Sequence, residues 1–96
     1  MTYPVIPELY GIVAQRLLDE IGGKNYYSGS FSFDYGSKEC RFIASLIIYR
    51  HTERFPEGDF DRIEDVVPVW WEFHTFDAEG EHPNDFSFSE LKHYLF

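Results

Sequence analysis

The stretch VVPVWWEFHTF, residues 66–76, decides the fold because it is the clearest strand in the chain. Its β-branched and aromatic side chains favour extended structure. Successive side chains of a strand point to opposite faces, so the adjacent Trp70 and Trp71 cannot enter the same core layer. We expect Trp71 to lie in the core and Trp70 on the opposite face. Strict alternation places Val67, Val69, Trp71, Phe73 and Thr75 on the core face, and Val66, Pro68, Trp70, Glu72, His74 and Phe76 on the other. Since proline cannot donate to a ladder, the strand is expected to lie at an edge or to carry a bulge at Pro68.

A helix is expected over residues 7–21, upstream of this strand. Pro7 suits the first helical position, where the missing N–H is not needed. Gly22 and Gly23 then supply the left-handed residue with which many helices end. The apolar stripe recurs at the three- and four-residue spacing of a helix that lies on a core. It consists of Leu9, Ile12, Val13, Leu17 and Ile21.

Two further strands are expected between this helix and residue 66. Residues 26–35 alternate aromatic and small polar side chains, which is typical of a strand with one solvated face. A turn at 35–38 leads into residues 39–50, whose β-branched content favours a strand over a helix. Residues 51–65 are polar and contain Pro56 and Gly58, so they are expected to form a long irregular connection.

The C-terminal residues predict a turn at 77–81 and a last helix over 88–95. Ser87 and Glu90 have the spacing of a capping box, which marks a helix start. Residues 86–88 are also compatible with a short fourth strand. The order of elements therefore predicts an α+β fold, with a three- or four-stranded antiparallel sheet, the N-terminal helix on one face and a short C-terminal helix.

Length and composition predict one small domain that spans residues 1–96. The aromatic share of 20% is ample for a packed core. Cys40 is the only cysteine, so an internal disulfide is excluded and a reducing compartment is expected. We expect a cytoplasmic protein, because the first residues lack the pattern of a signal peptide and no stretch is apolar enough to span a membrane.

The charge of the chain is strongly uneven along its length. The formal net charge is −9, and all of the excess lies in residues 51–96, because residues 1–50 carry as many bases as acids. Binding to nucleic acid or to an anionic membrane requires a basic surface, so both are disfavoured. A protein is therefore the expected partner, and a second copy of the chain is one candidate for it.

The face that carries Trp70 is the candidate contact surface. If helices cover only the other face, Trp70 remains partly exposed as an apolar patch bordered by polar groups, which is typical of an interface. The residues expected on this surface are Trp70, Glu72, His74, Ile43 and Ile47. We therefore expect a binding or regulatory module without catalytic activity. Coverage of this face by the last helix, the long connection or the N-terminus would remove the surface.

An enzyme or a small-ligand carrier is the alternative, with a cleft beside Glu72 and His74. A carboxylate two residues away on the same strand face can orient an imidazole for proton transfer. No nucleophile, cofactor motif or metal-ligand spacing accompanies this pair, so a surface ion pair is favoured, and neither a cofactor nor a metal ion is expected.

Two acidic segments complete the candidate features. Neither has the ligand order of a calcium-binding loop, so solvated loops are favoured. A mimic of DNA, whose carboxylates imitate phosphates, is a further alternative, although strand order separates the two segments. Their acids are Glu57, Asp59, Asp61, Glu64, Asp65, Asp77, Glu79 and Glu81.

Overall fold

The computed structural model describes residues 2–96 and confirms the predicted α+β fold. Its elements are α1 (Pro7–Ile21), β1 (Tyr26–Tyr35), β2 (Lys38–Phe55), β3 (Gly58–Asp77), β4 (Gly80–His82) and α2 (Phe88–Leu95). The strands form one antiparallel sheet in the order β1-β2-β3-β4. Among these residues no helix has the length and apolar character needed to cross a membrane.

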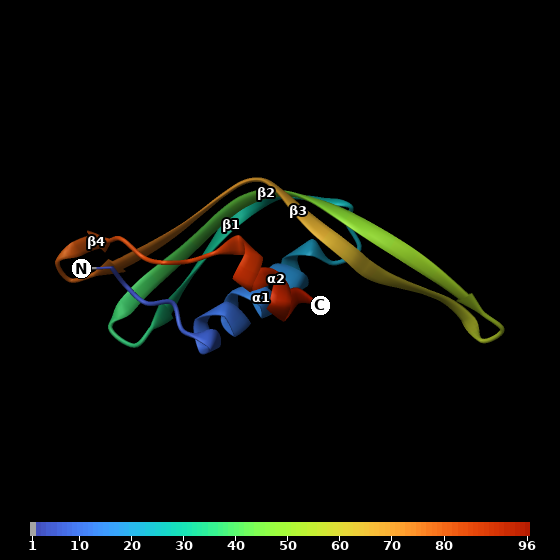
Figure 1. Ribbon diagram of the computed structural model, residues 1–96, viewed down its shortest axis with the longest axis horizontal. Helices are drawn as coiled ribbons and strands as arrows, with labels where there is room; N and C mark the ends of the chain where they lie inside the picture. Colours follow the sequence, from blue (N-terminus) through green and yellow to red (C-terminus); the bar gives the residue numbers. More distant parts are fainter. Residues whose placement is uncertain (1) are drawn as a thin grey trace.

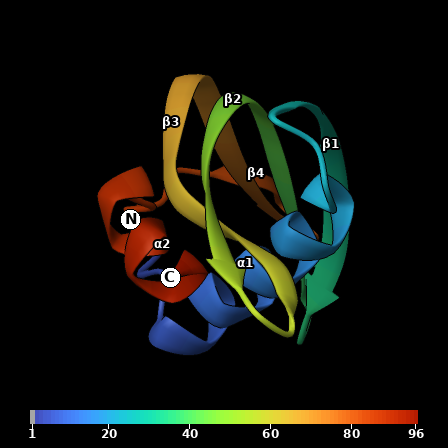
Figure 2. The same ribbon diagram turned by 90° about the vertical axis from the view of Figure 1, so that its right-hand side faces the viewer.

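The sheet arches over the two helices, which both lie on its concave side (Figure 1). The core fills the space between them, and its fully buried members include Val13 and Leu17 of α1 and Phe42 and Leu46 of β2. Neither α1 nor α2 covers the convex side, which we call the outer face (Figures 1 and 2). The molecule is elongated, with extents of 56 × 23 × 18 Å.

The expected irregular connection at 51–65 is wrong, because β2 and β3 continue through it as a two-stranded arm. Pro56 and Glu57 form its turn, and Gly58 follows with a φ of 142° that favours glycine. The arm extends away from the helices at one end of the molecule (Figure 1). Phe55 and Phe60 contact each other near its tip, and both remain largely exposed.

Residues 86–88, whose sequence is compatible with a short fourth strand, do not form one. The fourth strand is β4, which pairs with Thr75, Phe76 and Asp77 of β3. Phe86 instead lies in the core at 7% exposure, because the segment after β4 turns back beneath the sheet and brings its ring against Phe73. Ser87 is the N-cap of α2 as predicted, but its side chain makes no capping hydrogen bond, so the capping box does not form.

The face assignment within β3 holds only from Trp70 onward. Register shifts by one residue where Ser45 pairs with Trp70 and Leu46 pairs with Pro68, which leaves Val69 as the extra residue of a bulge. Of the two alternatives expected at Pro68, an edge position and a bulge, both are found: the bulge lies at the adjacent Val69, and β4 pairs only with Thr75, Phe76 and Asp77 of β3. Because a bulge changes the phase of alternation, Val66 is buried whereas Val67 and Val69 are exposed, opposite to the strict pattern.

Candidate functional site

The outer face carries an apolar patch at the top of the arch. Register places Tyr26, Ile47 and Val67 side by side across three strands. Trp70 lies in the next row, opposite Ser45, and 46% of its surface is exposed. We name Tyr26, Ile47, Val67, Val69 and Trp70 the outer patch; each is an exposed large apolar side chain.

The structure places the residues predicted from the sequence on this one face, but they differ in exposure. Ile47 belongs to the outer patch, whereas Ile43 is half-buried and pairs with Glu72 at its border. Tyr26, Val67 and Val69 were missed as surface residues. The two valines were missed because the bulge that exposes them cannot be located from alternation alone.

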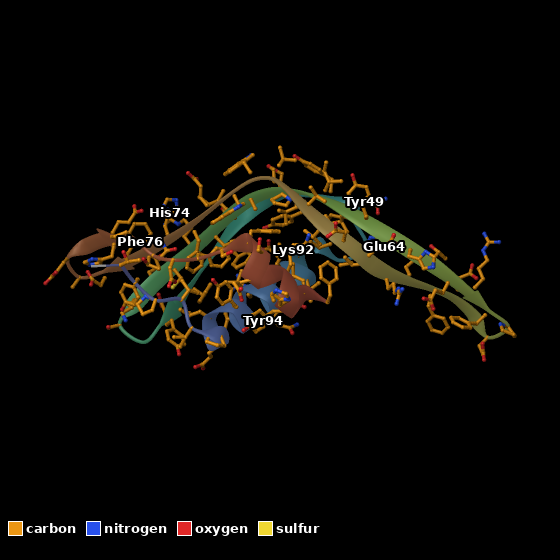
Figure 3. The ribbon with its side chains drawn as sticks, in the orientation of Figure 1. Tyr49, Glu64, His74, Phe76, Lys92 and Tyr94 are labelled. Carbon is orange, nitrogen blue, oxygen red and sulfur yellow. The ribbon has the colours of Figure 1, made fainter. Side chains whose placement is uncertain are left out.

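Trp71, the second tryptophan of the adjacent pair, lies on the helix side of the sheet. Trp71 packs against the core and contacts Phe86 and Phe88, with ring centroids 5.4 and 6.3 Å away. The two indoles therefore lie on opposite faces, as pleating requires. Figure 3 shows the same division for other side chains: Tyr49 and His74 lie above the sheet, and Lys92 and Tyr94 lie on the helix side.

His74 lies between two carboxylates at the border of the outer face. Its Nδ1 is 2.8 Å from Oε2 of Glu81 on β4, and its Nε2 is 3.7 Å from Oε2 of Glu72. Glu81 was assigned to an acidic loop, because β4 was not foreseen. Both ring nitrogens face carboxylate oxygens, so the arrangement orients the ring, and the contacts become ion pairs only when the imidazole is protonated.

A shallow depression of about 330 Å³ lies beside Glu72 and His74, where the ligand alternative requires a cleft. It is lined by Trp71, Glu72, Phe73, His74, Glu81, His82, Pro83, Asn84 and Phe86. This lining contains no hydroxyl, thiol or amine side chain that could act as a nucleophile. The depression therefore offers a proton acceptor without the remaining groups of an acyl-transfer site.

Cys40 lies against a second cavity of about 180 Å³ beneath the N-terminal segment. This volume is below the range of typical small-molecule sites. The thiol is only 1% exposed, and burial raises its pKa, an effect that the nearby Lys38 only partly opposes. A raised pKa lowers the thiolate fraction, which disfavours reaction at the buried Cys40.

The two acidic segments lie at opposite ends of the molecule. Glu57, Asp59, Asp61 and Glu64 belong to the arm, whereas Asp77, Glu79 and Glu81 lie in or beside the β3–β4 turn at the far end (Figure 1). At the base of the arm Asp65 is 2.7 Å from Nζ of Lys92 on α2. This contact, the largest influence on the group, lowers the pKa of Asp65.

One group of side chains has the donor types of a metal site. The ligand atoms of Asp77, Glu79 and His82 lie within 4.8 Å of one another. Oδ2 of Asp77 is 2.8 Å from the buried Nε2 of His82, at an angle unsuited to a directed hydrogen bond. The Glu79 backbone N–H donates to Asp77 and, with His82, holds the pKa of Asp77 low. The D-x-E-x-x-H spacing of these residues is present in the sequence. It was missed because the spacing alone does not show that the β3–β4 turn brings the three side chains together.

Comparison of the chain with protein-family models, with curated proteins and with solved structures finds no match.

Proposed function

We propose that this chain is a protein-binding module without catalytic activity, and that the outer patch is its contact surface. One observation carries the proposal: Trp70 exposes 46% of its surface on a sheet face that neither helix covers. Exposed apolar clusters of this kind on small proteins mark contact surfaces. Tryptophan is also among the residues that contribute most to binding when they become buried in an interface.

Shape and charge together favour a different protein over a second copy at this surface. The outer face is convex, and two convex faces touch over a small area, whereas stable interfaces bury about 800 Å² per partner. Two copies also carry −9 each. The partner therefore presents an apolar groove bordered by Lys or Arg, which would speed its encounter with the acidic chain.

The observations favour this function over the two alternatives. The lining of the depression beside His74 holds no hydroxyl, thiol or amine side chain, so an acyl-transfer reaction would find no nucleophile of these kinds there. A DNA mimic needs its carboxylates along one strip, and the two acidic segments lie at opposite ends of a 56 Å molecule.

The test compares Trp70→Glu with Phe60→Glu, an equally polar change at an exposed aromatic of the arm. A protein captured from cell extract on the wild-type chain is purified and titrated with both variants by calorimetry. We expect Trp70→Glu to weaken binding by at least about 30-fold, the roughly 2 kcal/mol that defines an interface hot spot. Phe60→Glu should change the affinity by less than about threefold, because exposed residues outside an interface contribute little. Equal affinities of wild type and Trp70→Glu would overturn the proposal.

A further inference from the structure

The β1 edge of the sheet is a second candidate contact surface, and its features indicate which partner it binds. β1 is the terminal strand of the sheet, and no other strand of residues 2–96 pairs with its free side (Figure 2). It is ten residues long, whereas a typical strand has about five or six. Such an edge presents a row of unpaired N–H and C=O groups.

The ladder identifies which residues of β1 direct their backbone groups outward. Asn25 accepts a bond from the N–H of Ile48, which extends the register in which Tyr27 pairs with Leu46. Hydrogen-bonded pairs alternate along an antiparallel ladder. The odd-numbered residues of β1 therefore bond to β2, and the even-numbered residues point their N–H and C=O groups away from the sheet. These outward residues are Tyr26, Ser28, Ser30, Ser32 and Asp34.

The opposite edge of the sheet, unlike the β1 edge, is protected against pairing with a strand of another molecule. Where β4 does not reach, β3 carries Pro68, two register shifts and a row of charged side chains. Proline, bulges and charges are the devices that prevent edge-to-edge pairing. β1 has no proline, no lysine and no register shift, and Asp34 is its only charged residue. Its outward residues carry small serine hydroxyls at the centre of the strand, which do not obstruct another strand.

The distribution of acidic residues also favours the β1 edge for contact between two copies. The excess of acids lies in residues 51–96, which include the arm and the β3–β4 turn, on the opposite side of the sheet from β1. A pair of chains that meet along β1 therefore brings together the least charged strands of two molecules that each carry −9.

We propose that two copies of this chain pair antiparallel through β1 and form one continuous eight-stranded sheet. A two-fold axis at Ser30 sets Ser30 opposite Ser30 of the second copy, Ser28 opposite Ser32, and Tyr26 opposite Asp34. In this register outward-directed groups meet outward-directed groups along the whole strand, and the two Asp34 carboxylates lie at opposite ends of it. Trp70 lies on β3, two strands away from this contact, so the contact is independent of the proposed function at Trp70.

The test uses the two-fold axis itself. Ser30→Lys keeps every backbone hydrogen bond but sets two ammonium groups opposite each other in the dimer, and like charges directly opposite destabilise a strand pair. Ser30→Glu does the same with carboxylates. By sedimentation velocity from micromolar to near-millimolar concentration, the wild type should reach twice 11.4 kDa. Each charged variant should remain at 11.4 kDa, and an equimolar mixture of the two should recover the doubled mass.

Two controls separate this contact from others. Ser30→Ala retains the N–H and should dimerise like the wild type, and Trp70→Glu should also dimerise, since Trp70 lies on β3 and not on β1. A wild type that stays at 11.4 kDa throughout would overturn the proposal, as would a mixture whose mass matches that of either charged variant alone. If Trp70→Glu abolishes the dimer and the charged Ser30 variants retain it, the two copies meet through the outer face and the β1 proposal is wrong.

Discussion

Replacement of Phe86 by alanine is expected to lower the free energy of unfolding by about 3–5 kcal/mol, as for other large truncations in a core. Its ring is stacked on Phe73 at 4.4 Å between centroids. It also contacts Tyr10 of α1, Phe42 of β2 and Trp71 of β3, with centroids 5.1 to 5.9 Å away. Phe86 thus joins the N-terminal helix to the two central strands, and alanine would leave all four rings facing a cavity.

Urea denaturation followed by far-ultraviolet circular dichroism measures this loss, with Phe60→Ala as the matched control. Phe60 has 57% of its surface exposed near the tip of the arm and contacts Phe55. Because little of its surface is buried, the control should lose less than about 1 kcal/mol. Equal losses in the two variants would show that Phe86 is not a core residue.

The second large effect separates the adjacent tryptophans. Trp71→Ala is expected to cost about 3 kcal/mol, because its indole packs against Phe86 and Phe88 on the helix side. Trp70→Ala should cost no more than about 1 kcal/mol, because nearly half of its surface is already in contact with water. The chemical change is identical, so the difference reports only which face of the sheet the helices cover.

Thermal and urea unfolding of both variants under one set of conditions give this comparison. Trp70→Ala should lower the melting temperature by no more than about 4–8 °C, the shift that a loss of about 1 kcal/mol gives a domain of this size. Stability losses of similar size, or a larger loss for Trp70→Ala, would contradict the assignment of the two faces.

Much of the fold could be predicted because local signals agree with the tertiary structure. Pro7 and Gly22 bound α1 where expected, and the alternation of residues 26–35 gave the whole of β1. The adjacency of Trp70 and Trp71 gave their division between faces without any knowledge of strand order.

The remaining features depend on contacts that the local pattern does not encode. The arm has solvent on both faces, so its strands lack the apolar alternation from which strands are recognised, and Pro56 and Gly58 mark a tight turn within it rather than a loop. The bulge at Val69 reverses the faces of Val66 and Val67, and a single sequence does not reveal the phase change. The role of Phe86 depends on the path of the chain after β4.

The candidate surface was foreseen in part for the same reasons. Trp70 and Ile47 were expected on it, and the structure places both there, but strand order was needed to join them to Tyr26 and to identify β1 as a free margin. Glu81 reaches His74 only because β4 folds back along β3. A strand of three residues is too short to be recognised from its sequence pattern, so this contact could not be predicted.

Acrylamide quenching of tryptophan fluorescence tests the central claim most directly, in single-tryptophan variants made by Trp71→Phe and by Trp70→Phe. The account predicts that Trp70 is quenched several-fold more strongly than Trp71, that this holds in the dimer as in the monomer, and that the captured partner protects Trp70 alone. Equal quenching of the two indoles in the free chain, or protection of Trp70 by self-association, would contradict it.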